Sequence, residues 1–263
     1  MLAGADSQSL QNGPGRLRGP EKRDMEDLGF PALAGTQAEC DQLAAKFKGW
    51  NWKTTDLIGA AASKEALLNA RSPYILHLAT HGFFEQGPKA ETKIEPQLAD
   101  FAPTFTLSRF FINPMHRSGL ALAGAETTLE AWKRGDVPPI ETDGIVTAED
   151  ISTIDLKDTW LVTLSACDTG SGEARAGEGV LGLRRGFIEA GAQNLLMTLW
   201  PISDQFTVQI MSDFYEAAHK SGDAPLALAT VQRDWLVRLR KEKGLAQAVN
   251  LAGPFIMNSQ GKP

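Results

Sequence analysis

Two short apolar runs, each followed by a reactive side chain, constrain the fold of this chain more than any other feature. The run at residues 160–164 is unbroken and rich in branched and aromatic residues, which is typical of a strand buried on both faces in a parallel sheet. Cys167 follows this run by three residues, and a stretch with several glycines continues to Gly182. Because open α/β sheets bind ligands beyond the carboxyl ends of their strands, a cysteine at this point is placed to meet a substrate. The alternative is that Cys167 is a small buried hydrophobic residue, which is the usual role of a lone cysteine.

The second run, residues 74–82, has the same design and ends in His81 and Gly82. If the two runs are neighbouring strands about 4.8 Å apart, the imidazole of His81 and the sulfur of Cys167 face one cleft. Nucleophilic catalysis by cysteine needs this pair, because the imidazole takes the thiol proton and returns it to the leaving amine. The backbone N–H groups of Gly82 and Cys167 are then candidates for an oxyanion hole, and Gly82 lets a substrate carbonyl approach closely.

Four sequence motifs resemble the CHAT domain, a module of the caspase, legumain and separase group of cysteine peptidases. They are residues 76–82, 118–124, 164–170 and 177–183, and they occur in the family order. The resemblance implies an α/β fold, namely a three-layer α/β/α caspase-like sandwich with a mostly parallel central sheet. It also implies that His81 is the general base and Cys167 the nucleophile. In this family the domain often follows helical repeats that sense a signal, so a regulatory sensor domain or partner is expected.

These features predict a cysteine endopeptidase that cleaves a protein substrate through an acyl-enzyme thioester. An alternative from another class is a catalytically silent caspase-like interaction module in which both motifs are intact. A third alternative is nucleotide binding by Gly177-x-Gly179-x-x-Gly182. That motif is weak, because a dinucleotide loop follows its strand at once and needs an acidic residue at the end of the next strand. We therefore expect no cofactor, and interpret these glycines as allowing a loop to move. Glu178 is predicted to lie near the start of a helix that continues through residues 181–188, where its charge suits the helix dipole.

Composition agrees with a cytoplasmic peptidase. The net charge of -6 and the pI near 5.3 argue against direct binding of nucleic acid or of an anionic membrane. Two cysteines cannot build a disulfide framework, and no segment approaches the roughly 18 apolar residues of a membrane span. A reducing cytoplasm would keep Cys167 as a thiol.

The domain organisation expected from the sequence has two parts. Residues 1–30 form a loop-rich N-terminal segment with one strand at residues 1–5, and residues 31–263 form the CHAT caspase-like peptidase domain. The opening resembles the middle of a CHAT domain, so we expect residues 1–30 to be the end of a truncated half-domain.

Two carboxylates are candidates for substrate binding. Asp168 follows the nucleophile and is predicted either to shape the turn at Thr169 and Gly170 or to help select the substrate. Asp204 follows the apolar run at residues 194–200. In separases the corresponding loop carries acids that receive a basic P1 side chain, and Asp204 matches that pattern in part. The alternative is that Ser203 or Asp204 caps the helix predicted at residues 205–219. The loop at residues 85–117 leaves the sheet behind His81 and is predicted to form a wall of the substrate groove, a flap or a passive insertion.

His77 invites a metal-binding interpretation because it stands four residues before His81. On a strand, such residues share a face but lie about 13 Å apart, too far to bind one ion. We therefore predict no metal site and assign His77 to the core as a hydrogen-bonded residue.

Several helices are predicted from their capping residues and apolar stripes. Residues 36–47 have a capping box at Thr36 and Glu39 and a stripe that places Cys40 in the core. Ser63 and Thr147 are predicted to cap short helices. A further helix is predicted after residue 223, ending at residue 244, and a last strand at residues 254–257.

Overall fold

The structure is a computed structural model that describes residues 2–4, 29–30, 33–84, 115–138, 143–165, 176–200 and 202–261, without the side chains of residues 2–4, 34, 84, 176–180 and 204. In chain order, the elements are β1 (Leu2–Gly4), α1 (Ala34–Gly49), β2 (Leu57–Ile58), the 3-10 helix η2 (Gly59–Ala61), α2 (Lys64–Leu68), β3 (Ile75–Phe84), β4 (Ser118–Ala121), α3 (Ala125–Lys133), β5 (Ile145–Thr147), α4 (Ala148–Ser152), β6 (Leu161–Leu164), α5 (Ala176–Glu189), β7 (Asn194–Thr198), α6 (Asp204–Ser221), α7 (Ala224–Lys243), α8 (Leu245–Ala252) and β8 (Phe255–Ser259).

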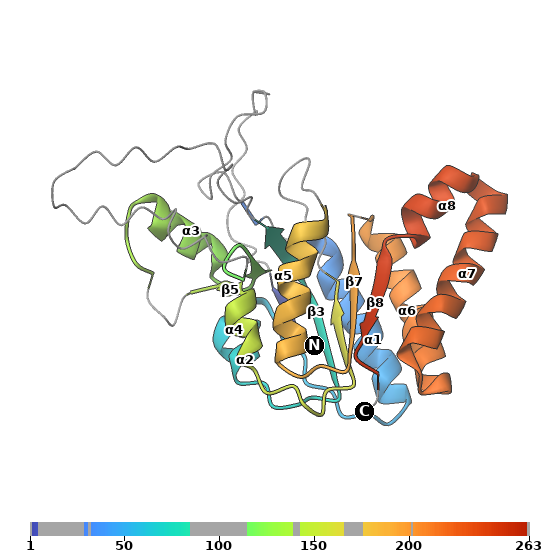
Figure 1. The fold of residues 1–263 in the computed structure, drawn as a ribbon, viewed down its shortest axis with the longest axis horizontal. Coiled ribbons are helices and arrows are strands. Elements are labelled where there is room, and N and C mark those ends of the chain that lie inside the picture. The colour runs from blue at the N-terminus through green and yellow to red at the C-terminus, as the bar shows by residue number, and fades with distance from the viewer. Residues whose placement is uncertain are drawn as a thin grey trace.

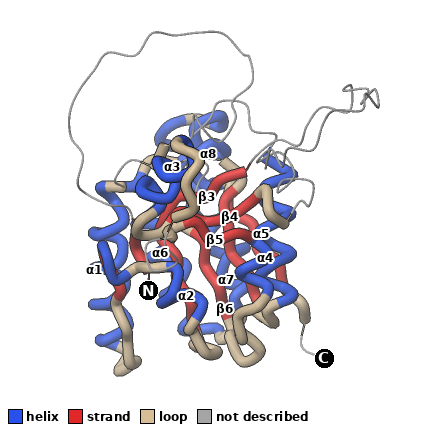
Figure 2. Tube along the Cα trace, turned by 90° about the vertical axis from the view of Figure 1, so that its left-hand side faces the viewer, coloured by secondary structure: helices blue, strands red, loops and turns tan. Residues whose placement is uncertain are grey.

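A mostly parallel sheet forms the centre of the protein (Figure 1). Its strand order is β2-β1-β3-β6-β7-β8, and the neighbours are parallel except for the pair β7 and β8. Strands β4 and β5 continue the sheet as an antiparallel extension beside the end of β3 (Figure 2). Parallel neighbours need crossover connections, which the intervening helices supply.

Helices cover both faces of the sheet, so the fold is a three-layer α/β/α sandwich (Figure 1). One hydrophobic cluster joins α1, α6, α7 and α8 to the sheet, and the other joins α2, α4 and α5 to the opposite face. Alternation along β6 connects the two, because Leu161 packs in the first cluster and Val162 in the second. The predicted fold class is confirmed, with the strand at residues 160–164 buried on both faces.

Two predicted helix caps are confirmed. The Ser63 side chain accepts a hydrogen bond from the Ala66 N–H at the start of α2. Thr147 caps α4 in a full capping box, in which its hydroxyl accepts from Asp150 N–H and the Asp150 carboxylate accepts from Thr147 N–H. Each cap satisfies N–H groups that a helix start leaves without an intrahelical partner.

The capping box predicted for α1 is wrong. The helix begins at Ala34, two residues earlier than expected, and Leu33 at its N-cap makes no side-chain hydrogen bond. The Thr36 hydroxyl instead donates to the Leu33 carbonyl oxygen. Glu39, which the capping box would have used, faces the sheet and is 4 % exposed. The predicted apolar stripe is nevertheless confirmed, and Cys40 on it is buried.

Three elements were missed because their sequence signals are short. The region after Gly124, expected to be a connection, contains α3, whose start follows a left-handed glycine rather than a polar cap. The strand β5 has only three residues. Gly244 ends α7 as predicted, but a new helix, α8, begins directly after it.

The glycine-rich stretch after the cysteine is shorter than predicted. Helix α5 begins at Ala176 and ends at Glu189, so the helix predicted to start near Glu178 is confirmed, and Gly177, Gly179 and Gly182 belong to it rather than to a loop. Within the described ranges, no helix is both long enough and apolar enough to cross a lipid bilayer.

Candidate active site

The two apolar runs that define the candidate site are adjacent parallel strands, as predicted. Ile75 on β3 lies opposite Leu161 on β6, and the pairing continues to Leu78 opposite Leu164. The Ser165 N–H then donates to the Leu78 carbonyl oxygen at 2.8 Å, which extends the ladder by one residue.

Counting three residues on from Leu78 and Leu164 leads to His81 and Cys167, the two predicted catalytic residues. His81 is within the described part of β3, whereas Cys167 and Asp168 lie outside the described residues. The register up to Ser165 shows that strands β3 and β6 run toward the same edge of the sheet. The roles of Cys167 and Asp168 stay predictions.

Strand β3 does not end at His81 and Gly82, as the sequence suggested, but continues to Phe84. Beyond the part that pairs with β6, it pairs with β4, so that His81 lies opposite Ala121 and Gly82 opposite Leu120. The strand continues because β4 pairs with it from His81 onward, directly after Thr80, the last residue of β3 that pairs with β1. The role of the Gly82 N–H in an oxyanion hole remains a prediction.

Gly119 in β4 makes room for this extension. A Cβ atom there would lie 2.3 Å from the Val146 carbonyl oxygen and 2.6 Å from the Phe83 ring. The Phe83 ring packs beside Phe30, whose ring centroid lies 5.7 Å from that of His81. His81 itself is 3 % exposed. Packing thus holds the imidazole within the protein rather than in open solvent.

His77 is confirmed as a hydrogen-bonded core residue. Its Nδ1 lies 2.9 Å from the hydroxyl of Tyr215 on α6, and that hydroxyl lies 2.8 Å from Thr163 Oγ1 on β6. Its Nε2 lies 3.2 Å from Glu39 Oε1 on α1, close enough for an ion pair but not aligned as a hydrogen bond. Burial raises the pKa of the Tyr215 phenol, so this hydroxyl stays protonated. This network of side chains joins strands β3 and β6 to helices α1 and α6.

Glu39 connects this network to the end of β6. Its Oε2 accepts a hydrogen bond of 2.9 Å from the hydroxyl of Ser165, two residues before Cys167. The neighbouring Cys40 thiol has its pKa raised to about 12, first by burial and then by the Glu39 charge. Cys40 is therefore a protonated core thiol, as predicted.

The sequence contained a signal for this network that was misinterpreted. Glu39 stands beside the buried stripe of its helix, and its acidic side chain was assigned to a cap that does not form. Tyr215 lies beside Phe214 on the buried face of α6, where its hydroxyl needs a partner.

The second candidate carboxylate, Asp204, is the first residue of α6. Ser203 is the N-cap residue but makes no side-chain cap hydrogen bond, so the alternative that Ser203 caps the helix is wrong. The Asp204 side chain, like the whole of residues 85–114, lies outside the description. Substrate binding by Asp204, and the alternative that it caps α6, stay predictions.

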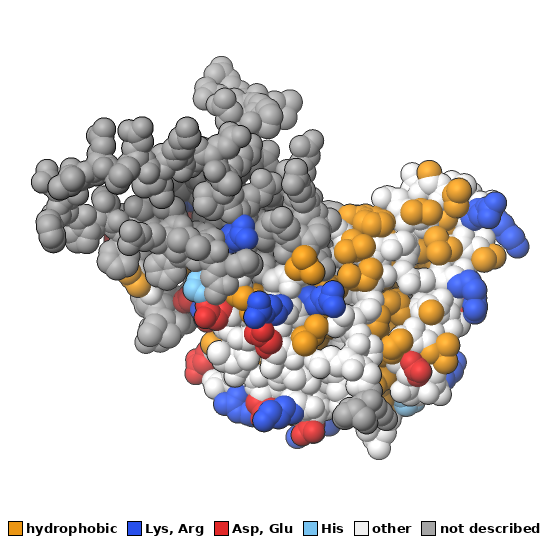
Figure 3. Space-filling model, viewed as in Figure 1, with side chains coloured by type: hydrophobic (Ala, Val, Ile, Leu, Met, Phe, Trp, Pro, Cys, Tyr) orange, Lys and Arg blue, Asp and Glu red, His pale blue; other side chains and the backbone are white. Residues whose placement is uncertain are grey.

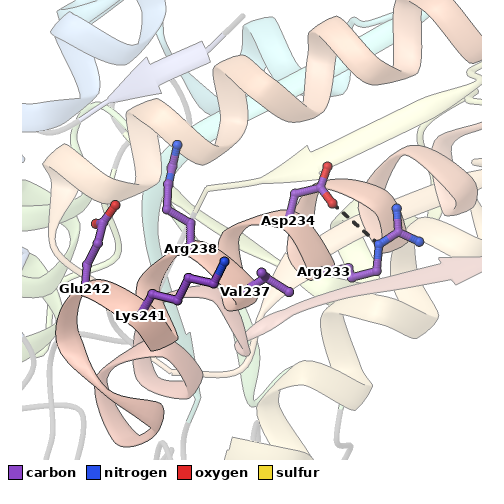
Figure 4. A pocket seen from close by; sticks show the side chains of 6 residues that line it. All are labelled: Arg233, Asp234, Val237, Arg238, Lys241 and Glu242. Carbon is purple, nitrogen blue, oxygen red and sulfur yellow. Dashed lines mark ion pairs between the residues drawn. The ribbon is translucent and has the colours of Figure 1, made fainter.

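A surface depression lies on α7, away from the candidate site (Figure 4). Its lining comes entirely from this helix: Arg233, Asp234, Val237, Arg238, Lys241 and Glu242. Arg233 pairs with Asp234 at 3.5 Å. Because no side chain of β3 or β6 lines it, this depression is not part of the site. Figure 3 shows exposed hydrophobic and basic side chains on the same side of the molecule as α7 and α8.

Among the residues that the structure describes, no group of three or more metal-binding side chains is close enough to hold a metal ion.

Comparison with known proteins agrees with the resemblance seen in the motifs. The family model of the CHAT domain matches residues 2–250. Tetratricopeptide repeat protein 28 of Homo sapiens is 23 % identical over 212 residues, and its Mus musculus counterpart is 24 % identical over 212 residues. Each match covers 78 % of this chain but 8 % of the relative, so the chain spans a small part of these proteins' length. The sequence match and the α/β/α sandwich together show that this chain belongs to the CHAT domain family.

Proposed function

We propose that this chain is a cysteine endopeptidase in which His81 is the general base and Cys167 the nucleophile. The observation that supports the proposal is the register of β3 and β6, because its last pair, Leu78 opposite Leu164, precedes His81 and Cys167 by three residues each. Membership of the CHAT domain family supports it, because the motifs that resemble the peptidase dyad are both present.

The proposed reaction has two halves. His81 takes the proton of the Cys167 thiol, and the thiolate attacks the carbonyl carbon of the scissile peptide bond. The N–H groups of Gly82 and Cys167 stabilise the oxyanion, after which the imidazolium protonates the leaving amine and a thioester remains. Water, deprotonated by His81, then attacks the thioester, releasing the acid and restoring the thiol.

The proposed substrate is a protein with a basic residue at P1. Asp204 begins α6, and Asp168 follows the nucleophile, so both belong to segments that leave the carboxyl edge of the sheet. A carboxylate in the cleft would pair with the guanidinium of arginine or the ammonium of lysine.

The proposed regulator is a domain or partner built of helical repeats. The relatives are tetratricopeptide repeat proteins by name, and this chain matches a small part of their length. We further propose a cytoplasmic location, in which the thiol stays reduced, and a peptidase domain at residues 31–263 preceded by a loop-rich segment at 1–30.

Cleavage of a peptide library by the parent chain and by Cys167→Ala tests the function. The proposal expects cleavage by the parent alone, with arginine or lysine at P1, and a weaker P1 preference in Asp204→Ala. Asp223→Ala is the matched control, since Asp223 caps α7 through the Leu226 N–H and lies at the other end of α6. Equal cleavage by the parent and Cys167→Ala would end the proposal.

A second candidate is a catalytically silent interaction module of the same family. The burial of His81, at 3 % exposure, favours it, because a substrate carbonyl cannot approach a covered imidazole without movement of the atoms around it. A peptide carrying a thiol-reactive warhead separates the two candidates. Selective labelling of Cys167 supports the peptidase, and labelling no faster than that of a free thiol supports the module.

A further inference from the structure

One face of the sheet carries a row of polar side chains that leads to the proposed dyad. Thr163 and His77 lie opposite each other in the β3–β6 register and both contact Tyr215. Because side chains alternate along a strand, residues two and four positions later return to the same face. Ser165 and His81 are those residues, and Ser165 already contacts Glu39 on the helix layer that covers this face.

Ser165 is the last described residue before the nucleophile, and it is held at two points. Its N–H donates to the Leu78 carbonyl oxygen at 2.8 Å, and its hydroxyl donates to Glu39 Oε2 at 2.9 Å. The backbone bond fixes the strand against β3, whereas the side-chain bond fixes it against α1. Two bonds in different directions restrict the orientation from which the chain continues to Cys167.

Glu39 is itself held firmly. Its side chain is 5 % exposed, its other oxygen lies 3.2 Å from His77 Nε2, and its helix buries Cys40 and Leu43 against the same layer. A buried carboxylate is costly unless its oxygens meet donors or cations. The Ser165 hydroxyl is the hydrogen-bond donor to Oε2, and the His77 ring lies close to Oε1. The network is therefore more than a chance surface contact.

We infer that Ser165 and Glu39 are positioning residues for Cys167: the buried carboxylate anchors the Ser165 hydroxyl and so sets the point and direction at which the chain leaves β6. This inference rests on the proposed function in taking Cys167 as the nucleophile. Neither residue is assigned a contact with substrate. Their effect is on the placement of the sulfur, and hence on the chemical step more than on substrate binding.

The test compares Ser165→Ala, which removes the hydroxyl, with Ser165→Thr, which keeps one. With the best library peptide, Ser165→Ala is expected to lower kcat roughly tenfold with little change in KM, because small displacements of reacting groups are costly. Ser165→Thr is expected to restore most of the loss. Ser259→Ala, at an exposed position on the edge strand β8, is the matched control and is expected to behave as the parent.

Glu39 enters the test through a double-mutant cycle. If Glu39 acts through Ser165, Glu39→Ala lowers kcat in the parent background but adds little in the Ser165→Ala background. Asp41→Asn, at an exposed carboxylate on the same helix, is the control. Thermal unfolding of each variant shows that it is folded at the assay temperature. If Glu39→Ala fails to fold, the Ser165→Ala and Ser165→Thr pair still decides.

A second readout separates failure of this inference from failure of the proposed peptidase. The rate at which iodoacetamide alkylates Cys167 is measured by mass spectrometry and does not require turnover. A slower rate in Ser165→Ala, restored in Ser165→Thr, supports the positioning role even if no peptide is cleaved. Unchanged alkylation and unchanged kcat in Ser165→Ala, with only a lower unfolding temperature, would show that the hydrogen bond is structural and overturn the inference.

Discussion

Leu78 and Leu164 lie opposite each other and form the last residue pair of the parallel strands β3 and β6. Ser165 adds one more backbone bond to this ladder, and from His81 onward β3 pairs with β4, which follows β1 along the strand. The carboxyl ends of parallel strands are the place where α/β sheets bind ligands. The proposed dyad residues, His81 and Cys167, follow this leucine pair by three residues in the sequence.

The two cysteines should differ sharply in reactivity. Cys40 is 1 % exposed and its pKa is raised to about 12, whereas Cys167 is proposed to form a thiolate. Iodoacetamide at pH 7 should therefore modify Cys167 in the native protein and both cysteines in denaturant, as read by mass spectrometry. Native labelling of Cys40 before Cys167 would contradict this assignment.

Removing the Tyr215 hydroxyl should destabilise the protein. Tyr215→Phe leaves His77 Nδ1 and Thr163 Oγ1 without this buried partner, a loss of about 1–3 kcal/mol in the free energy of unfolding. Tyr74→Phe is the control, because Tyr74 is 57 % exposed, and should change stability little. Urea unfolding measures both. Equal unfolding free energies for the two variants would show that the network adds no stability.

Close packing between α5 and α4 should make Gly186 intolerant of a side chain. A Cβ atom at Gly186 would lie 2.5 Å from the Ala148 carbonyl oxygen, so Gly186→Ala should cost about 1–3 kcal/mol by overpacking. Gly49→Ala on α1, where nothing lies within 4 Å of the new atom, should be neutral or slightly stabilising. Thermal or urea unfolding distinguishes them, and a neutral Gly186→Ala would contradict the packing described for these helices.

Glu216 should contribute stability that is lost in acid. Hydrogen bonds from Lys46 and then Lys220 lower its pKa from 4.5 to about 2. The folded state binds the Glu216 proton less tightly than the unfolded state does. The contribution of Glu216 to stability is therefore present above about pH 4.5 and disappears as the pH falls through 2.

As the pH falls from about 5 to about 2, the parent chain should therefore lose more stability than Glu216→Gln. The folded and unfolded pKa values of Glu216 set this window. The effect is modest because the side chain is 38 % exposed and solvent screens the pair. Glu130→Gln, an exposed glutamate on α3, serves as the control and should follow the parent. Urea midpoints across this pH range give the comparison, and parallel curves for the parent and Glu216→Gln would contradict the assignment.

Much of the fold was predictable because its signals are local. The apolar runs at β3, β6 and β7 and the caps at Ser63 and Thr147 depend on residues near one another in the sequence. Adjacency of β3 and β6 followed from placing both motifs at one sheet edge, and the structure has them paired. The short elements α3, β5 and α8 were missed because packing, rather than local preference, determines them.

The candidate site was less predictable because its supporting contacts are long-range. The Glu39 carboxylate meets Ser165, 126 residues away, and His77 meets Tyr215, 138 residues away. Local rules assigned Glu39 to a helix cap, whereas in the folded protein its carboxylate accepts a hydrogen bond from the Ser165 hydroxyl. The continuation of β3 past Gly82 likewise depends on β4, which the local sequence of β3 does not reveal.

The most direct test of the proposed dyad is the pH dependence of Cys167 alkylation in the parent and in His81→Ala. Mass spectrometry follows iodoacetamide labelling of Cys167, with His116→Ala as a control for loss of a histidine outside the site. If His81 pairs with the sulfur, Cys167 in the parent is alkylated at pH values well below the usual thiol pKa of about 8.5. The pH profile of alkylation then shifts up toward that value in His81→Ala but not in His116→Ala. Identical profiles for the parent and His81→Ala would contradict the account.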